Sequence, residues 1–77
     1  MDELQPIEKL SPREREIVRR LADGEPQKAI AASLGIAVRT VEVYTQRARE
    51  KLQARTVTHL VVIWSRAAII GTEGDGV

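Results

Sequence analysis

Three residues of this 77-residue chain have side chains suited to reading base pairs: Glu42, Val43 and Gln46. Glutamine can pair bidentately with adenine, glutamate can accept a hydrogen bond from cytosine N4, and an apolar side chain can contact a thymine methyl group. At about 100° per residue, the three lie on one side of a helix predicted over residues 38–53. The same side also carries Arg39, Arg47 and Glu50. This mixture favours a face that enters the major groove, and the alternative is an ordinary solvated surface.

The opposite side of the same helix is apolar or small. Its members are Val38, Val41, Thr45, Ala48 and Leu52. They fall in one narrow sector at helical spacing, so we expect them to pack inward.

The segment before this helix has the features of a helix-turn-helix. A short helix is expected from about Pro26 to Leu34, and the turn is Gly35-Ile36-Ala37. Two short helices joined by a turn of about three residues with a glycine are typical of this motif. Ala31 is small enough for the helices to cross closely, and Ile36 fills the corner. Ile30, Leu34 and Val41 are expected to close the small core.

Two further helices complete an all-α, four-helix bundle. Ser11, Pro12 and Glu14 form a capping-box start, and Gly24 marks the end of the first helix. The last helix is expected from about Thr56 to Ile70. Residues 1–9 are predicted to be a partly disordered arm, residues 10–70 the domain, and the glycine-rich residues 71–77 a disordered tail.

Composition excludes several functions. There is no cysteine and one histidine, His59, which we expect at the surface, so no metal site is predicted. No nucleophile–base pair or phosphate loop occurs, so neither an enzyme nor a cofactor is expected. No apolar run is long enough to cross a membrane, and a cytoplasmic protein is expected. The net charge is only +1, but basic residues gather between Pro26 and Arg55 while both ends are acidic.

In order and spacing, the sequence resembles the LuxR/GerE-type DNA-binding domain over about residues 10–65. The matching segments are Leu10 to Val18, Leu21 to Gly24, Lys28 to Ala31, Leu34 to Ile36, Arg39 to Val43, and Lys51-Leu52. The resemblance implies a helix-turn-helix bundle that binds double-stranded DNA, with residues 38–53 as the recognition helix. It also implies that Glu42, Val43 and Gln46 face base edges.

The resemblance also implies backbone contacts, which position a protein on DNA without specifying sequence. The positions that match phosphate contacts in the family are Lys28, Thr40, Arg47, Lys51, Arg55 and Thr56. We add Arg39 because it lies on the same outward side.

Five positions depart from the family pattern, two at caps, two at base contacts and one at Tyr44. Pro26 and Ala37 stand where the family usually has capping residues. Alanine in place of a serine cap at position 37 weakens the start of the recognition helix by about 1 kcal/mol. Glu42 and Gln46 stand where many members have a base, so the DNA sequence read should differ. Tyr44 stands where histidine is common, and it could pack at the edge of the core or touch a phosphate.

The last helix is apolar nearly all round, which predicts a homodimer through it. Leu60 and Ile63 are assigned to the core. The candidate dimer contacts are Val61, Trp64, Ala68 and Ile69. Trp64 could instead only cover the core. Since no receiver or ligand-binding module is present, the chain is expected to be a stand-alone regulator or an excised domain. The alternative function is a protein-interaction module that pairs with a larger LuxR-type regulator and antagonises it.

Overall fold

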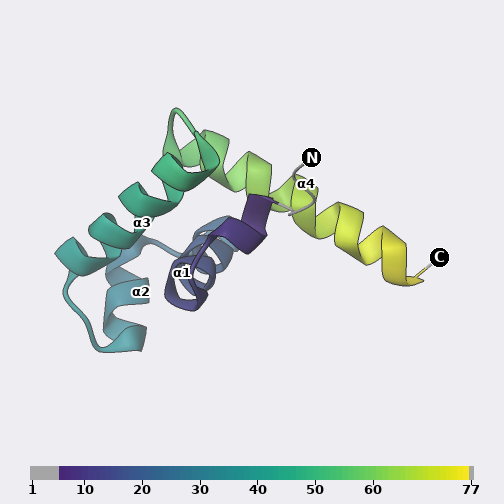
Figure 1. The fold of residues 1–77 in the computed structure, drawn as a ribbon. Helices are drawn as coiled ribbons and strands as arrows, with labels where there is room; N and C mark the ends of the chain where they lie inside the picture. Colours follow the sequence, from purple (N-terminus) through teal and green to yellow (C-terminus); the bar gives the residue numbers. More distant parts are fainter. Residues whose placement is uncertain (1–5, 77) are drawn as a thin grey trace.

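Over the part of the chain that the structure describes, the fold consists of four α-helices and one short 3₁₀ helix (Figure 1). The computed structural model describes the backbone of residues 6–76 and the side chains of residues 7–68. The elements are η1 (Pro6–Lys9), α1 (Pro12–Ala22), α2 (Gln27–Leu34), α3 (Val38–Leu52) and α4 (Val57–Gly76). The described backbone contains no strand, which confirms the all-α prediction.

The start of α1 is the predicted capping box. The backbone N–H of Glu14 donates to Ser11 Oγ at 3.1 Å, and the backbone N–H of Ser11 donates to Glu14 Oε1 at 2.8 Å. These two bonds satisfy amides that a helix start otherwise leaves unpaired. At the other end Asp23 caps α1 and Gly24 has a φ of +91°, as expected from its position.

Two clusters of buried side chains hold the helices together. The first joins α1, α2 and α3 and consists of Ile17, Ile30, Ala31 and Val41. The second joins α1, α3 and α4 and consists of Leu10, Val18, Ala48, Ala54 and Leu60, with Leu52, Ile63 and Trp64 packed against it. Because α1 and α3 contribute to both clusters, α3 is anchored along its length on the rest of the domain.

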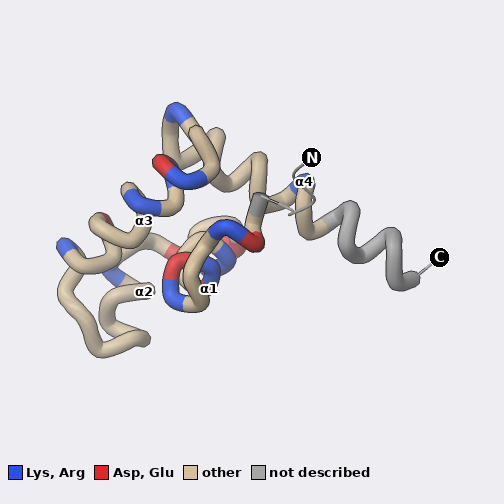
Figure 2. Tube along the Cα trace, viewed as in Figure 1, with Lys and Arg blue, Asp and Glu red and all other residues tan. Residues whose placement is uncertain are grey.

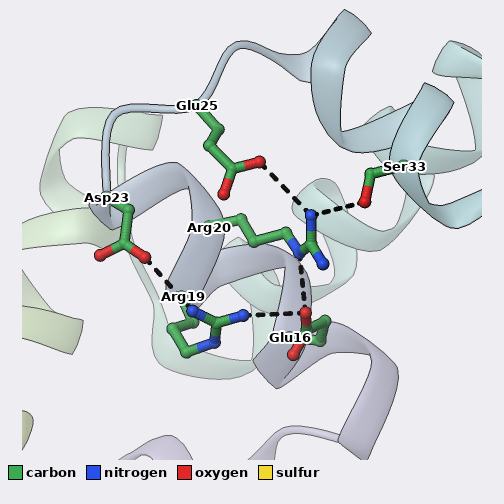
Figure 3. A network of polar contacts seen from close by, with 6 residues as sticks. All are labelled: Glu16, Arg19, Arg20, Asp23, Glu25 and Ser33. Carbon is green, nitrogen blue, oxygen red and sulfur yellow. Dashed lines mark hydrogen bonds and ion pairs between the residues drawn. The ribbon is translucent and has the colours of Figure 1, made fainter.

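A polar network fastens α2 to α1 (Figure 3). Arg20 of α1 donates to Glu16 at 2.7 Å, to Ser33 of α2 at 2.9 Å and, more weakly, to Glu25 at 3.4 Å. The hydrogen bond with Glu16 raises the pKa of Arg20, and the hydrogen bonds from Arg20 and Arg19 lower the pKa of Glu16. Both groups therefore stay charged, and the guanidinium spans from α1 to the helix before the turn.

The ends of the chain differ from the sequence prediction. Pro6–Lys9, expected in a partly disordered arm, form η1 and contact α3 and α4; residues 1–5 lie outside the described residues. The last helix was expected to end near Ile70, but α4 continues to Gly76. Glycine weakens a helix without removing a hydrogen-bond donor as proline does, so three glycines do not force a helix end. The disorder expected for residues 71–77 stays a prediction, because no side chain beyond Ala68 is described.

Within the described residues, no helix is both long and apolar enough to cross a membrane.

Candidate nucleic-acid interface

The turn between α2 and α3 has the predicted form. Gly35 caps α2 in the left-handed conformation, with a φ of +69°, and the N–H of Ile36 donates to the Ala31 carbonyl at 3.0 Å. This is the conformation that glycine adopts without strain. Ala31 is only 3% exposed, and Ile36 packs against the cluster between the two helices. The turn therefore sets the direction in which α3 leaves α2.

The inward side of α3 follows the prediction except at its first residue. Val41, Thr45 and Ala48 are buried, and the Thr45 hydroxyl donates to the Val41 carbonyl at 2.8 Å. Val38 was expected inward but is 36% exposed. Helical side chains tilt toward the N-terminus, and Val38, as the first residue of α3, has no preceding turn of the helix beside it.

The outward side of α3 brings the three predicted base-reading residues together. Glu42, Val43 and Gln46 are all exposed and line one shallow surface hollow. Arg39, Arg47 and Glu50 complete its lining. Val43 is 42% exposed, which leaves an apolar side chain in water in the middle of a charged surface. These six residues form an accessible ridge along the outward side of α3, opposite its buried side, and the shallow hollow lies among their side chains.

Gln46 is held by two charged neighbours on the next turn of α3. Its Nε2 donates to Glu50 Oε2 at 3.0 Å, and its Oε1 accepts from Arg49 Nη1 at 3.2 Å. Arg49 also donates through Nη2 to the carbonyl of Arg55, in the turn before α4. The sequence analysis missed Arg49 and the contact of Glu50 with Gln46, although spacings of three and four residues on a helix could have indicated both pairs.

Basic residues accompany this ridge (Figure 2). Lys and Arg positions lie along α3 and on the turn that leads to α4, and they outnumber the two acidic positions of α3, Glu42 and Glu50. The Arg47 guanidinium lies over the Tyr44 ring, 5.9 Å from its centre, and Tyr44 packs against the cluster between α1, α2 and α3. Tyr44 thus lies at the edge of the core and supports Arg47 by a cation–π contact.

Most of the predicted phosphate contacts are accessible. Lys28, Arg39, Arg47, Arg55 and Thr56 are exposed, and Thr40 is half-buried. Thr56 Oγ1 also accepts from the N–H of His59 at 3.0 Å, as a cap for α4 should. His59 is exposed, and its Nδ1 accepts from the N–H of Arg55 at 3.1 Å, so this histidine helps to shape the turn.

Lys51 has a partner that the sequence analysis did not identify. Its Nζ lies 2.7 Å from Glu14 Oε1, in an ion pair between α3 and the first turn of α1. The Glu14 side chain is only 4% exposed. Burial raises the pKa of Glu14, but the hydrogen bonds from Lys51 and the Ser11 backbone lower it more, so the net pKa lies below its ordinary value. The two residues are far apart in sequence, so no local pattern could have joined them.

The candidate dimer contacts on α4 differ in how far the domain buries them. Trp64 is partly buried against the cluster between α1, α3 and α4, whereas Val61 is half-buried and Ala68 exposed. Ile69 lies outside the described side chains. Val62, which the sequence analysis did not select, is 39% exposed. Leu60 and Ile63 lie in or against the core, as expected.

A helix-turn-helix with an exposed, partly basic second helix defines a class of DNA-binding domains. Comparison with known families agrees, because residues 8–64 match the family described as bacterial regulatory proteins, luxR family. The chain belongs to this family, which makes it a DNA-binding domain of the kind found in transcription regulators. This confirms the resemblance seen in the sequence.

Three regulators illustrate the similarity. The chain is 43% identical to the tetrathionate response regulatory protein TtrR of Salmonella typhimurium over 54 residues, 70% of this chain and 26% of that protein. It is 38% identical to the transcriptional regulatory protein FixJ of Bradyrhizobium diazoefficiens over 64 residues, 83% and 31% of the two chains. It is 51% identical to the probable transcriptional regulatory protein NarL of Mycobacterium tuberculosis over 43 residues, 56% and 20% of the two chains. The chain thus spans between a quarter and a third of the length of the first two. No solved structure gives a significant match.

Proposed function

We propose that the chain binds DNA sequence-specifically, with α3 in the major groove. The observation that carries this proposal is the two-sided nature of α3. Val41, Thr45 and Ala48 anchor one side, and the other side presents a mixed polar and apolar ridge around Val43 and Gln46. Glu42 extends that ridge and is suited to cytosine N4.

Phosphate contacts would hold α3 in register. Lys28, Arg39, Thr40, Arg47, Arg55 and Thr56 are accessible for this purpose. Lys51 is proposed as a contact as well, but its bond to Glu14 leaves only part of its ammonium hydrogen-bonding capacity for a phosphate. Because contacts with DNA phosphates release counterions, affinity should fall steeply with salt, with a slope of about −0.9 per phosphate neutralised.

The test is selection of bound sequences from a random DNA library with the purified chain, followed by titration of the selected site at several salt concentrations. A recovered motif and a steep salt slope are expected. Gln46→Ala should cost about 1–3 kcal/mol on the selected site and remove the preference at one base pair. Arg47→Gln should instead weaken all sequences alike and reduce the salt slope by about 1. Binding that ignores DNA sequence at every salt concentration would contradict the proposal.

We also propose that the chain binds as a homodimer through α4, in the cytoplasm, where bacterial DNA lies. Val61, Trp64 and Ala68, with Val62 added, provide an apolar surface that the domain leaves wholly or partly uncovered. A two-fold axis through this helix would present two copies of α3 to half-sites about one helical turn apart. Ile69 continues the same side of the helix by its spacing.

A second candidate function rests on the same exposed surface of α4. The chain could pair with a larger LuxR-type regulator and antagonise it, because exposed apolar side chains such as Val62 suit a related helix. In that case the purified chain would select no DNA motif. Added to a longer regulator of the family, it would form a mixed complex and lower that regulator's affinity for its own site.

A further inference from the structure

We propose that Arg49 and Glu50 hold the Gln46 amide in a single orientation and thereby select adenine over guanine at the base pair that Gln46 reads. This inference deepens the proposed function and rests on it, since it requires α3 to lie in the major groove.

The chemistry of the two neighbours permits only one orientation of the amide. A carboxylate can only accept hydrogen bonds, and a guanidinium can only donate them. The amide nitrogen of Gln46 therefore donates to Glu50 Oε2 at 3.0 Å, and the amide oxygen accepts from Arg49 Nη1 at 3.2 Å. Rotation of the amide by a half turn would set oxygen against carboxylate and N–H against guanidinium, and would lose both bonds.

Arg49 is itself fixed by the folded chain. Its Nη2 donates to the carbonyl of Arg55, in the turn that joins α3 to α4. Its Nε is shielded from solvent and, among the described side chains, is the one buried nitrogen or oxygen without a hydrogen-bond partner. Unlike Gln46 and Glu50, which are exposed, Arg49 is partly buried. The restraint on the amide therefore begins at a side chain held by the fold, and not at two freely moving surface groups.

The restrained amide keeps one N–H and one oxygen lone pair for a base, because an amide has two of each. Adenine offers a matching acceptor and donor at N7 and N6, whereas guanine offers two acceptors at N7 and O6. An unrestrained glutamine can donate both of its N–H groups, one to guanine N7 and one to O6. In this chain Glu50 accepts one of the two N–H groups, so pairing with both guanine acceptors would break a hydrogen bond to a charged group, which is about twice as strong as a neutral one.

The position of Glu50 supports this role. Glu50 lines the same hollow as Gln46, Val43 and Arg39, on the ridge proposed to enter the groove. A carboxylate there repels the phosphate backbone and lowers affinity for all sequences. Glu50 thus weakens binding to every sequence while it orients the Gln46 amide, and this combination increases the discrimination between DNA sequences.

The test compares the wild-type chain, Glu50→Gln and Asp23→Asn on the selected site and on duplexes that carry A·T or G·C at the base pair sensitive to Gln46→Ala. The wild type is expected to prefer A·T by about tenfold or more. Glu50→Gln should lower this ratio by about fivefold, because a neutral amide pairs in either orientation and more weakly. Asp23→Asn removes a charge of the same sign from an exposed position at the end of α1, outside the proposed base-reading surface, and should leave this ratio unchanged. Glu50→Gln should also raise overall affinity.

The outcomes separate this inference from the proposed function. If the wild type selects a motif and Gln46→Ala removes one preference, but Glu50→Gln leaves the A·T to G·C ratio intact, the orienting role is wrong while the function stands. An equal fall in Glu50→Gln and Asp23→Asn would assign the effect to net charge and also overturn the inference. A preference for guanine at this base pair would contradict the inference directly. If the wild type selects no motif, the proposed function fails, and the inference fails with it.

Discussion

At the scale of single residues, Glu14 serves both the start of α1 and the position of α3. Its Oε1 accepts from the backbone of Ser11 at 2.8 Å and from Lys51 Nζ at 2.7 Å. The carboxylate is almost fully buried, while Lys51 is 41% exposed. A charge in such a place is stable only when it is paired, so the ion pair fixes the C-terminal half of α3 to the first turn of α1.

Glu14→Gln tests this connection. The variant amide can still accept from Ser11 but loses the charge that binds Lys51. Because one partner is solvent-screened, we expect a loss of about 1 kcal/mol and a fall of about 4–8 °C in the unfolding midpoint. Circular dichroism on heating measures it. Glu42→Gln, at an exposed position, should change stability by less than about 0.5 kcal/mol. Equal midpoints for the two variants would contradict the role of the ion pair.

The same residue predicts a dependence on pH. The pKa of Glu14 is lowered in the folded chain relative to its ordinary value of 4.5. A lowered pKa contributes stability that is fully present above the unfolded value and is lost as the pH falls through the folded one. The difference in unfolding free energy between wild type and Glu14→Gln should thus be constant near neutral pH and shrink in acid below about pH 4.5. Urea unfolding at a series of pH values measures this difference. If the difference in unfolding free energy is the same at every pH, the charge of Glu14 is not its cause.

At the scale of elements, α3 begins without a side-chain cap. Ala37 occupies the cap position with a φ of −74° and a ψ of 151°, which is the extended conformation that a capping residue adopts. The amide of Thr40 is the donor that a capping hydroxyl would bind, three residues into the helix. The missing cap expected from the sequence is confirmed.

Ala37→Ser should therefore stabilise the domain. Ala37 is exposed, so the added hydroxyl meets no packing obstacle. We expect a gain of about 1 kcal/mol and a higher unfolding midpoint, measured by thermal denaturation. Ala32→Ser is the matched control, because it places the same hydroxyl at an exposed position inside α2, where serine is a poorer helix former than alanine. A midpoint that moves the same way in both variants would show that capping is not the reason.

At the scale of the whole molecule, the exposed apolar side of α4 decides the oligomeric state. Leu60 and Ala67 face the core, while Val62 lies 39% exposed on another side of the helix. Sedimentation equilibrium at tens of micromolar should give the mass of a dimer, and Val62→Lys should give that of a monomer, because a charge cannot be buried unpaired in the contact. Val38→Lys makes the same change at an exposed position of α3 and should leave the mass unchanged. A monomeric wild type would exclude the homodimer proposed through α4.

The local features of this chain were predictable because they depend on neighbours in sequence. The capping box at Ser11 and Glu14, the left-handed Gly35 and the two sides of α3 follow from spacings of a few residues, which a helix converts directly into positions. The family could be predicted for the same reason, since its motif is a set of such spacings.

What only the tertiary structure decided are the contacts between residues far apart in the chain and the exact exposure at helix ends. Lys51 turned toward Glu14 because folding brought the C-terminal half of α3 onto α1. Val38 is exposed although its spacing places it on the inward side of α3, because it is the first residue of the helix and has no preceding turn beside it. The common side of α3 that carries Glu42, Val43 and Gln46 was thus predictable from the sequence, and their contact with bases stays a prediction. Their restraint by Arg49 and Glu50 required the structure, because the Arg55 carbonyl that fixes Arg49 reaches it only through the fold of the turn before α4.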